Sequence, residues 1–241
     1  MNMSSLTIMQ FNLENFFILL DRYKGENLQN LSEEQWQSFS LSLNKSKPLN
    51  KIWPIAKLLL IIKPDIVLVN EAGGMESLKN FCNLFLQDTY TPYLVEGNSD
   101  RGIDIGYLIR SDLKQKFLLI SHKNRPINFL YDHEKTHVTP EEKSVQLNRF
   151  GYKRSHYFSR DVSELRIFKD ELSHSPALII LGVHLKSKLD SDGVDPQGRS
   201  RRTAELKTLI EIYQEIVSET HQQVPILIGG DFNGNASPIE T

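Results

Sequence analysis

The sequence predicts an α/β fold, of the α+β kind, in which mixed β-sheets are flanked by helices. Segments with apolar residues at helical spacing alternate along the chain with short apolar runs of strand length. Several neighbouring strand-like runs are joined by connections too short for a helical crossover, so antiparallel pairs accompany parallel ones. The 241 residues show no repeat, no low-complexity tract and no linker, which predicts a single domain over residues 1–241.

The expected elements begin with a strand over 6–13, where apolar residues alternate imperfectly. A polar stretch over 21–48 follows, and it predicts an insertion or lid with a short helix after a weak capping box at Ser32. Helical spacing predicts helices over residues 51–62, 77–87 and 198–218. Short apolar runs predict strands over residues 66–69, 104–109, 116–120, 157–158, 162–168, 177–185 and 224–228.

Composition excludes several classes of protein. The formal net charge of −2 provides no global basic field for nucleic acid or anionic lipid, although a local basic groove stays open. No apolar run approaches the roughly 18 residues of a membrane span, and the N-terminus lacks a secretory signal pattern. These features predict a cytoplasmic protein. Cys82 is the single cysteine, so no intrachain disulfide forms, and nothing in the sequence predicts an oligomeric state.

Four predicted strands end in polar residues that the strand pattern itself does not require. In α/β folds the carboxyl ends of strands commonly bind ligands. Taken singly, an Asn or Asp after a strand is more often a turn residue, and a lone His more often has a structural role. The functional interpretation depends on finding four such ends in one chain. The residues are Asn12 and Glu14, Glu71, His184 and Lys186, and Asp231 and Asn233.

These residue types fit metal-dependent hydrolysis of a phosphoester. Mg²⁺ takes oxygen ligands and is usually held by one or two carboxylates together with substrate phosphate. Glu71 is therefore the expected metal ligand, with Asn12 or Glu14 beside it, and Mn²⁺ is a possible substitute. No Cys and His cluster has the spacing of a zinc site.

The remaining strand-end residues suit the attack of water on phosphorus. Asp231 can accept a proton from the attacking water or orient it. Asn233 can help to place that water or steady the metal shell. His184 can donate a hydrogen bond to a phosphate oxygen as charge develops there.

Basic residues predict a cleft for substrate phosphate. Arg101, Arg160 and Lys186 are the candidates, since arginine makes bidentate contacts with phosphate. Three further arginines, at 199, 201 and 202, open the last predicted helix, where positive charge opposes the helix dipole. They indicate either a phosphate or an acidic partner nearby, or side chains that extend into solvent.

Six segments, in this order along the chain, resemble the endonuclease/exonuclease/phosphatase superfamily, the group of the deoxyribonuclease I-like enzymes. They are FNLENF, PDIVLVNEAGG, RGIDIGYLIR, FSRDVSEL, LGVHLKSK and ILIGGDFNGNAS. The resemblance implies a four-layer αββα sandwich of two mixed β-sheets flanked by helices. It also implies Mg²⁺-dependent hydrolysis of a phosphoester substrate, nucleic acid being one possibility.

The resemblance also implies roles for single residues. Asn12 matches the asparagine near the metal, and Glu71 matches the metal-binding glutamate, although Asn70 stands where the family usually has glutamine. Glu14 falls where some members keep a second acidic ligand. His184 and Arg160 match phosphate-contacting residues, and Asp231 with Asn233 matches the Asp-x-Asn pair that orients the nucleophile.

One part of the family pattern has no counterpart in the sequence. The family normally ends with two further strands and a Ser-Asp-His segment, which predicts a fragment or a natural truncation. The leading hypothesis is a phosphodiesterase or endonuclease. The alternatives are a non-catalytic module that binds phosphate or nucleic acid, a phosphatase acting on a phosphorylated lipid or small molecule, and a fold completed by a partner chain.

Overall fold

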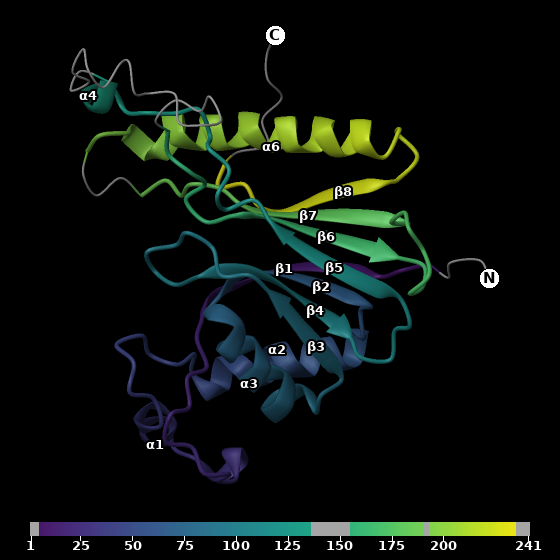
Figure 1. Ribbon diagram of the computed structural model, residues 1–241. Coiled ribbons are helices and arrows are strands. Elements are labelled where there is room, and N and C mark those ends of the chain that lie inside the picture. Colours follow the sequence, from purple (N-terminus) through teal and green to yellow (C-terminus); the bar gives the residue numbers. More distant parts are fainter. Residues whose placement is uncertain (1–4, 136–154, 190–192, 235–241) are drawn as a thin grey trace.

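Two four-stranded sheets pack face to face, with helices on their outer sides, in the computed structural model of the protein (Figure 1). The structure describes residues 5–135, 155–189 and 193–234. Each sheet contains parallel and antiparallel pairs. The predicted fold class, mixed sheets flanked by helices in a layered sandwich, is confirmed.

The first sheet has the strand order β1-β2-β4-β3. Its strands are β1 (Ile8–Phe16), β2 (Ile66–Ala72), β3 (Tyr90–Leu94) and β4 (Asp104–Arg110). The helices α2 (Leu49–Ile62) and α3 (Gly74–Leu86) cover its outer face. Both helices bury an apolar face in one cluster with side chains of β1 and β2.

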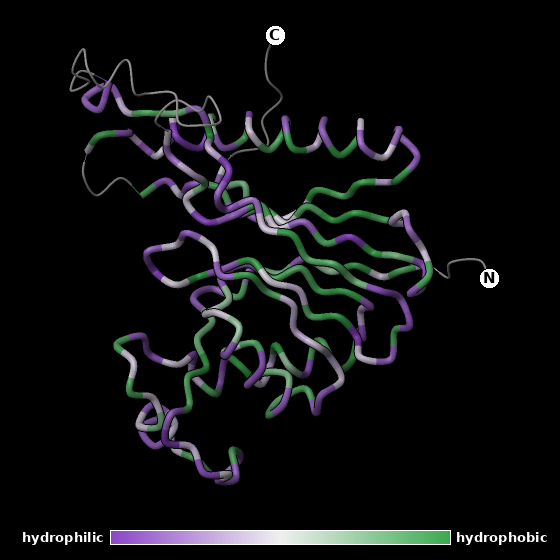
Figure 2. The backbone as a smooth tube through the Cα atoms, viewed as in Figure 1, coloured by the Kyte–Doolittle hydropathy of each residue, from purple (hydrophilic) through white to green (hydrophobic). Residues whose placement is uncertain are grey.

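The second sheet has the order β5-β6-β7-β8, and its last pair is parallel. Its strands are β5 (Lys116–Ser121), β6 (Val162–Phe168), β7 (Leu178–His184) and β8 (Ile226–Asp231). The long helix α6 (Arg199–Glu219) lies across its outer face. Figure 2 shows the apolar segments concentrated in the strands, while the connecting loops are hydrophilic.

The short elements lie outside this sandwich. They are η1 (Leu28–Asn30), α1 (Glu33–Ser38), α4 (Asp132–Lys135) and η2 (Pro196–Gly198). The capping box at Ser32 is confirmed, since its side chain accepts from the N–H of Gln35 and the Gln35 side chain accepts in return. None of the helices in the described ranges is both long and apolar enough to cross a bilayer.

Two strand predictions differ from the structure. The strand β3 is missing from the sequence-based expectation because Pro92 interrupts its pattern, and the structure places it at a sheet edge, where proline is tolerated. The expected strand at 157–158 is only an isolated bridge between Tyr157 and Pro126.

The outer edge of β8 is open in the part of the chain that the structure describes, because β8 pairs there only with β7. Leu227 and Ile228 are 40% and 38% exposed. Successive residues of a strand face opposite sides of the sheet, so both faces of β8 are partly uncovered. The expectation that the family's last strands are missing applies to this open edge of β8, and it stays a prediction.

Candidate active site

The carboxyl ends of four strands meet at one end of the sandwich. The strands β1 and β2 are parallel, as are β7 and β8, and His184 lies opposite Asp231 in the second pair. Glu71, His184 and Asp231 each offer a ligand atom, and these three atoms lie within 4.8 Å of one another. The structure thus brings together residues from three of the four polar strand ends.

Glu71 reaches this position through an irregularity in the first sheet. The register of β2 against β4 shifts between Val69 and Ala72, and Glu71 has a φ of 62°. Such a bulge turns a side chain away from the regular alternation of the strand. The backbone N–H of Asn15, itself at a φ of 51°, donates to Oε2 of Glu71 at 2.8 Å.

Asn12 supplies the fourth strand end and links the two sheets. Its Nδ2 donates to Oδ2 of Asp231 at 3.1 Å and to Oε1 of Glu71 at 3.4 Å. Its Oδ1 accepts from the N–H of Glu14 at 2.9 Å. One amide therefore joins the carboxylates of Glu71 and Asp231.

Asn233 holds Asp231 and the end of β7 together. The N–H of Asn233 donates to Oδ1 of Asp231 at 2.9 Å, and its Nδ2 donates to the carbonyl of Leu185 at 2.9 Å. Asn233 has a φ of 50°, a backbone conformation that asparagine adopts more readily than most residues. The pair thus acts as one rigid turn at the end of β8.

His184 is buried and electrically neutral at physiological pH. Its side chain is 2% exposed, and Nδ1 has no hydrogen-bond partner among the described residues. Burial lowers the pKa of His184 to about 4, and the nearby Arg160 adds to this, while Asp231 and Glu71 oppose it. A neutral imidazole can still donate one hydrogen bond to an anion.

The lowered pKa of His184 predicts a loss of stability in acid. Above about pH 6.5 the imidazole is neutral in both folded and unfolded chains, so it does not affect stability. As the pH falls toward 4, His184 becomes protonated in the unfolded chain but stays neutral in the folded chain, so the folded state loses stability. The difference between 6.5 and about 4 corresponds to at most roughly 3 kcal/mol.

Urea unfolding at about pH 7.5 and about pH 4.5, in the presence of a chelator, measures this effect. The wild type should lose more unfolding free energy between the two values than His184→Gln. Carboxylates that titrate in the same range, such as the buried Asp161, whose pKa burial raises to about 6, are common to both proteins. Equal losses in the two proteins would show that His184 is not the source.

Glu14 lies differently from the expectation. Its side chain is 83% exposed, and its carboxylate lies 3.7 Å from Nζ of Lys47. Glu14 has a φ of 52° in the irregular end of β1, and it is not one of the three residues of the metal-type cluster. Its role as a second metal ligand stays a prediction.

The three predicted phosphate-binding cations line one pocket of about 660 Å³. Arg160 is 7% exposed, its Nε has no hydrogen-bond partner among the described residues, and burial lowers the pKa of its guanidinium. Arg101 donates from Nη2 to Oδ1 of Asn15, whose N–H holds Glu71. Lys186 lies two residues beyond His184. The pocket therefore opens beside the cluster of Glu71, His184 and Asp231.

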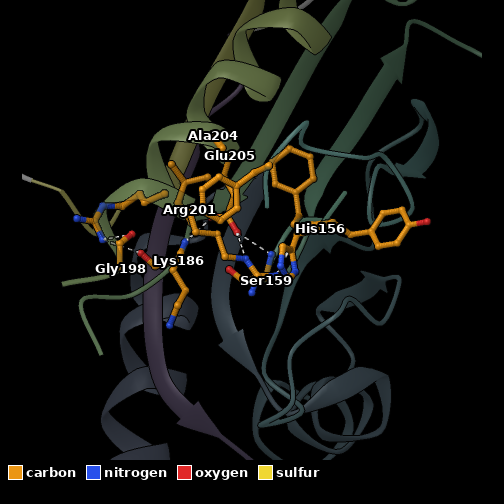
Figure 3. A network of polar contacts seen from close by, with 12 residues as sticks. His156, Ser159, Lys186, Gly198, Arg201, Ala204 and Glu205 are labelled. Carbon is orange, nitrogen blue, oxygen red and sulfur yellow. Dashed lines mark hydrogen bonds and ion pairs between the residues drawn. The ribbon is translucent and has the colours of Figure 1, made fainter. Parts of the chain in front are cut away.

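Sequence reasoning missed Glu205, which positions the walls of this pocket (Figure 3). Its carboxylate is fully buried and accepts from the N–H of Ser159 at 2.7 Å and of Lys186 at 2.6 Å. It thereby orients the two loops that carry Arg160 and Lys186. The sequence did contain one indication of its burial. Glu205 is at helical spacing from Leu209 and Ile212, so it lies on the buried face of α6.

The arginines at the start of α6 also have local partners. The buried carboxylate of Asp195 accepts from the N–H groups of Ser200 and Arg201, at 2.9 and 3.0 Å. Arg202 donates to the carbonyls of Lys186 and Gln197. An internal acid and loop carbonyls therefore offset part of the positive charge that the sequence places there.

Comparison with solved structures identifies the fold. The catalytic domain of human nocturnin, solved with a sulfate anion, has a TM-score of 0.53 at 13% identity, with 96% of this chain and 65% of that chain covered. A mannosyl-6-phosphatase from Bacteroides thetaiotaomicron gives 0.52 at 17% identity, with 95% and 66% covered. An endonuclease/exonuclease/phosphatase family protein from the same bacterium gives 0.53 at 16% identity, with 98% and 66% covered.

The chain thus has the deoxyribonuclease I-like fold of the endonuclease/exonuclease/phosphatase superfamily, and the resemblance carried by its motifs is confirmed at the level of the fold. It spans slightly less than two thirds of the length of these three structures. The sequence matches no protein-family model and no curated protein sequence.

Proposed function

We propose that the protein is a Mg²⁺-dependent phosphoester hydrolase, and more narrowly a phosphodiesterase or nuclease. One observation carries the proposal: Glu71, His184 and Asp231 place ligand atoms within 4.8 Å of one another, beside the buried Arg160. Two acids, a neutral imidazole and a guanidinium are the groups that hydrolysis of a phosphoester uses. The fold shared with a protein described as a phosphatase supports the proposal.

The donor set fits a hard divalent cation. Glu71 and Asp231 offer carboxylate oxygens, which suit Mg²⁺ and Mn²⁺. Glu71 would hold the ion, with Asp231 nearby and substrate oxygens completing the shell. When bound, such an ion supplies charge stabilisation at phosphate oxygens and lowers the pKa of a bound water.

The side chains of the protein would position and activate the other participants. Asp231, held by Asn12 and by the N–H of Asn233, would orient the attacking water and take up its proton. His184 would donate a hydrogen bond to a non-bridging oxygen while charge accumulates there. Arg160 is buried, and its Nε has no hydrogen-bond partner in the part of the chain that the structure describes, so it would bind the same phosphate.

Removal of the metal tests the proposal. The wild type should hydrolyse bis-p-nitrophenyl phosphate with Mg²⁺ or Mn²⁺ and not with excess chelator. Glu71→Gln should weaken Mn²⁺ binding in calorimetry by roughly tenfold or more, because an amide oxygen carries no charge. Glu76→Gln, an exposed acid in the first turn of α3, is the matched control.

Two results would contradict the proposal. A folded wild type that binds inorganic phosphate but hydrolyses nothing under any of these conditions would support a phosphate-binding module instead. Turnover that persists in excess chelator would exclude a dependence on the metal.

A further inference from the structure

The pocket beside the proposed catalytic cluster carries more positive charge than a single phosphate requires. Its volume is about 660 Å³, within the range of sites that hold a whole small ligand. Among the described residues, four cationic side chains line it, together with one acid, Asp100. The cations are Arg101, Arg160, Lys186 and Arg201.

These cations come from separate parts of the fold. Lys186 follows β7, which carries His184, and Arg160 precedes β6, whose first residue Val162 pairs with Val183 next to His184. Arg201 belongs to the first turn of α6, and its Nε lies 3.7 Å from the buried carboxylate of Glu205. Arg160 and Arg201 thus reach the pocket from different elements, so a phosphate bound between His184 and Arg160 need not use Arg201.

Two contacts fix the position of the Arg201 side chain. Its Nη2 donates to the carbonyl of Tyr157 at 3.1 Å, and its Nε lies 3.7 Å from Oε1 of Glu205 (Figure 3). Its side chain is 20% exposed, and Nε makes no hydrogen bond among the described residues. A guanidinium fixed in this way needs little ordering when an anion binds.

The close approach of α6 to the loop after β7 builds this part of the pocket. Gly198 has a φ of 58°, and a Cβ there would lie 2.3 Å from the carbonyl of Ser187. Only glycine allows the helix to begin so near Ser187, which lines the pocket with Arg201. The juxtaposition of Arg201, Ser187 and Lys186 is thus a property of the backbone.

We infer that Arg201, with Lys186 and Ser187, forms a second anion-binding subsite, so that the substrate is a small molecule with a second phosphate near the scissile one. The inference rests on the proposed function, because it takes the cluster of Glu71, His184 and Asp231 as the place of the scissile phosphate. None of the described residues that line the pocket is aromatic, so they offer no stacking surface of the kind that single-stranded nucleic acid uses.

A set of ligands that differ only in the second phosphate tests the inference. The probes are the bisphosphates of ethanediol, butanediol and hexanediol and the corresponding monophosphates, titrated by calorimetry into the metal-free protein. This measures binding without turnover, so its result is independent of whether hydrolysis of bis-p-nitrophenyl phosphate is found. Oligothymidylate forms a separate arm.

In the wild type, at least one bisphosphate should bind roughly tenfold or more tightly than its monophosphate. Arg201→Gln should reduce that advantage to about threefold or less. Ser187→Asp should do the same by placing an acid within the proposed subsite. This second variant covers the case in which loss of the contact with Tyr157 perturbs Arg201→Gln. Arg199→Gln, an exposed arginine in the same helical turn, should keep the full advantage.

Three outcomes would overturn the inference. The first is no bisphosphate advantage at any chain length. The second is an advantage that survives in both Arg201→Gln and Ser187→Asp. The third is tighter binding of oligothymidylate than of every bisphosphate, which would indicate a nucleic-acid strand in the pocket.

Discussion

Asp231→Asn should lower the metal-dependent turnover of bis-p-nitrophenyl phosphate by roughly 10²–10⁴-fold. The amide has nearly the same shape as the carboxylate and can still accept the N–H of Asn233, which the carboxylate now receives at 2.9 Å. It cannot take up a proton from water at neutral pH. The fold should therefore survive, while proton transfer and the hydrogen bond from Nδ2 of Asn12 are lost.

Asp170→Asn is the matched control for this substitution. Asp170 is exposed and follows β6 at the opposite end of the sheet from His184, so turnover should stay within about twofold of the wild type. Thermal melts of both variants check the fold. A well-folded Asp231→Asn protein with wild-type turnover would remove Asp231 from the proposed mechanism.

The fold could be predicted largely from local pattern, because apolar periodicity and short connections are local properties. The strand ends that form the candidate site could be predicted in the same way, because polar residues that follow a buried strand can be recognised in the sequence. The spacing within the site was not predictable. Asn12 and Asp231 are joined by one hydrogen bond across 219 positions of the chain, and no local pattern encodes that contact.

The misses have specific physical causes. The strand β3 was not predicted because Pro92 interrupts its sequence pattern, and proline is uncommon within strands. Glu205 was missed because its hydrogen-bond partners are backbone N–H groups, which no sequence pattern shows.

Unsatisfied polar atoms gather where the ligand is proposed to bind. Five buried side-chain atoms in the described residues lack a hydrogen-bond partner, and three of them are His184 Nδ1, Arg160 Nε and Arg201 Nε. Each such atom costs stability when buried. Their concentration at the cluster and its pocket is what a site that completes its hydrogen bonding with an anion would show.

The stability of this arrangement depends on Gly230, and Gly230→Ala should destabilise the protein by roughly 3 kcal/mol or more. Gly230 has a φ of 133°, a conformation nearly restricted to glycine. A Cβ at this position would lie 2.1 Å from the carbonyl oxygen and 2.9 Å from the nitrogen of Val183, which are backbone atoms of β7 and cannot rotate away.

Gly229→Ala is the internal control, because its Cβ would meet only the side chain of Leu68, at an ordinary 3.4 Å. For a chain of this size, 3 kcal/mol corresponds to a fall in Tm of about 6–12 °C for Gly230→Ala, and Gly229→Ala should change little. Gly230 precedes Asp231 in the register that faces His184, so activity should fall as well. Equal melting temperatures for the two variants would mean that β8 can shift away from β7 at little cost, and the fixed geometry proposed for Asp231 would then lose its structural basis.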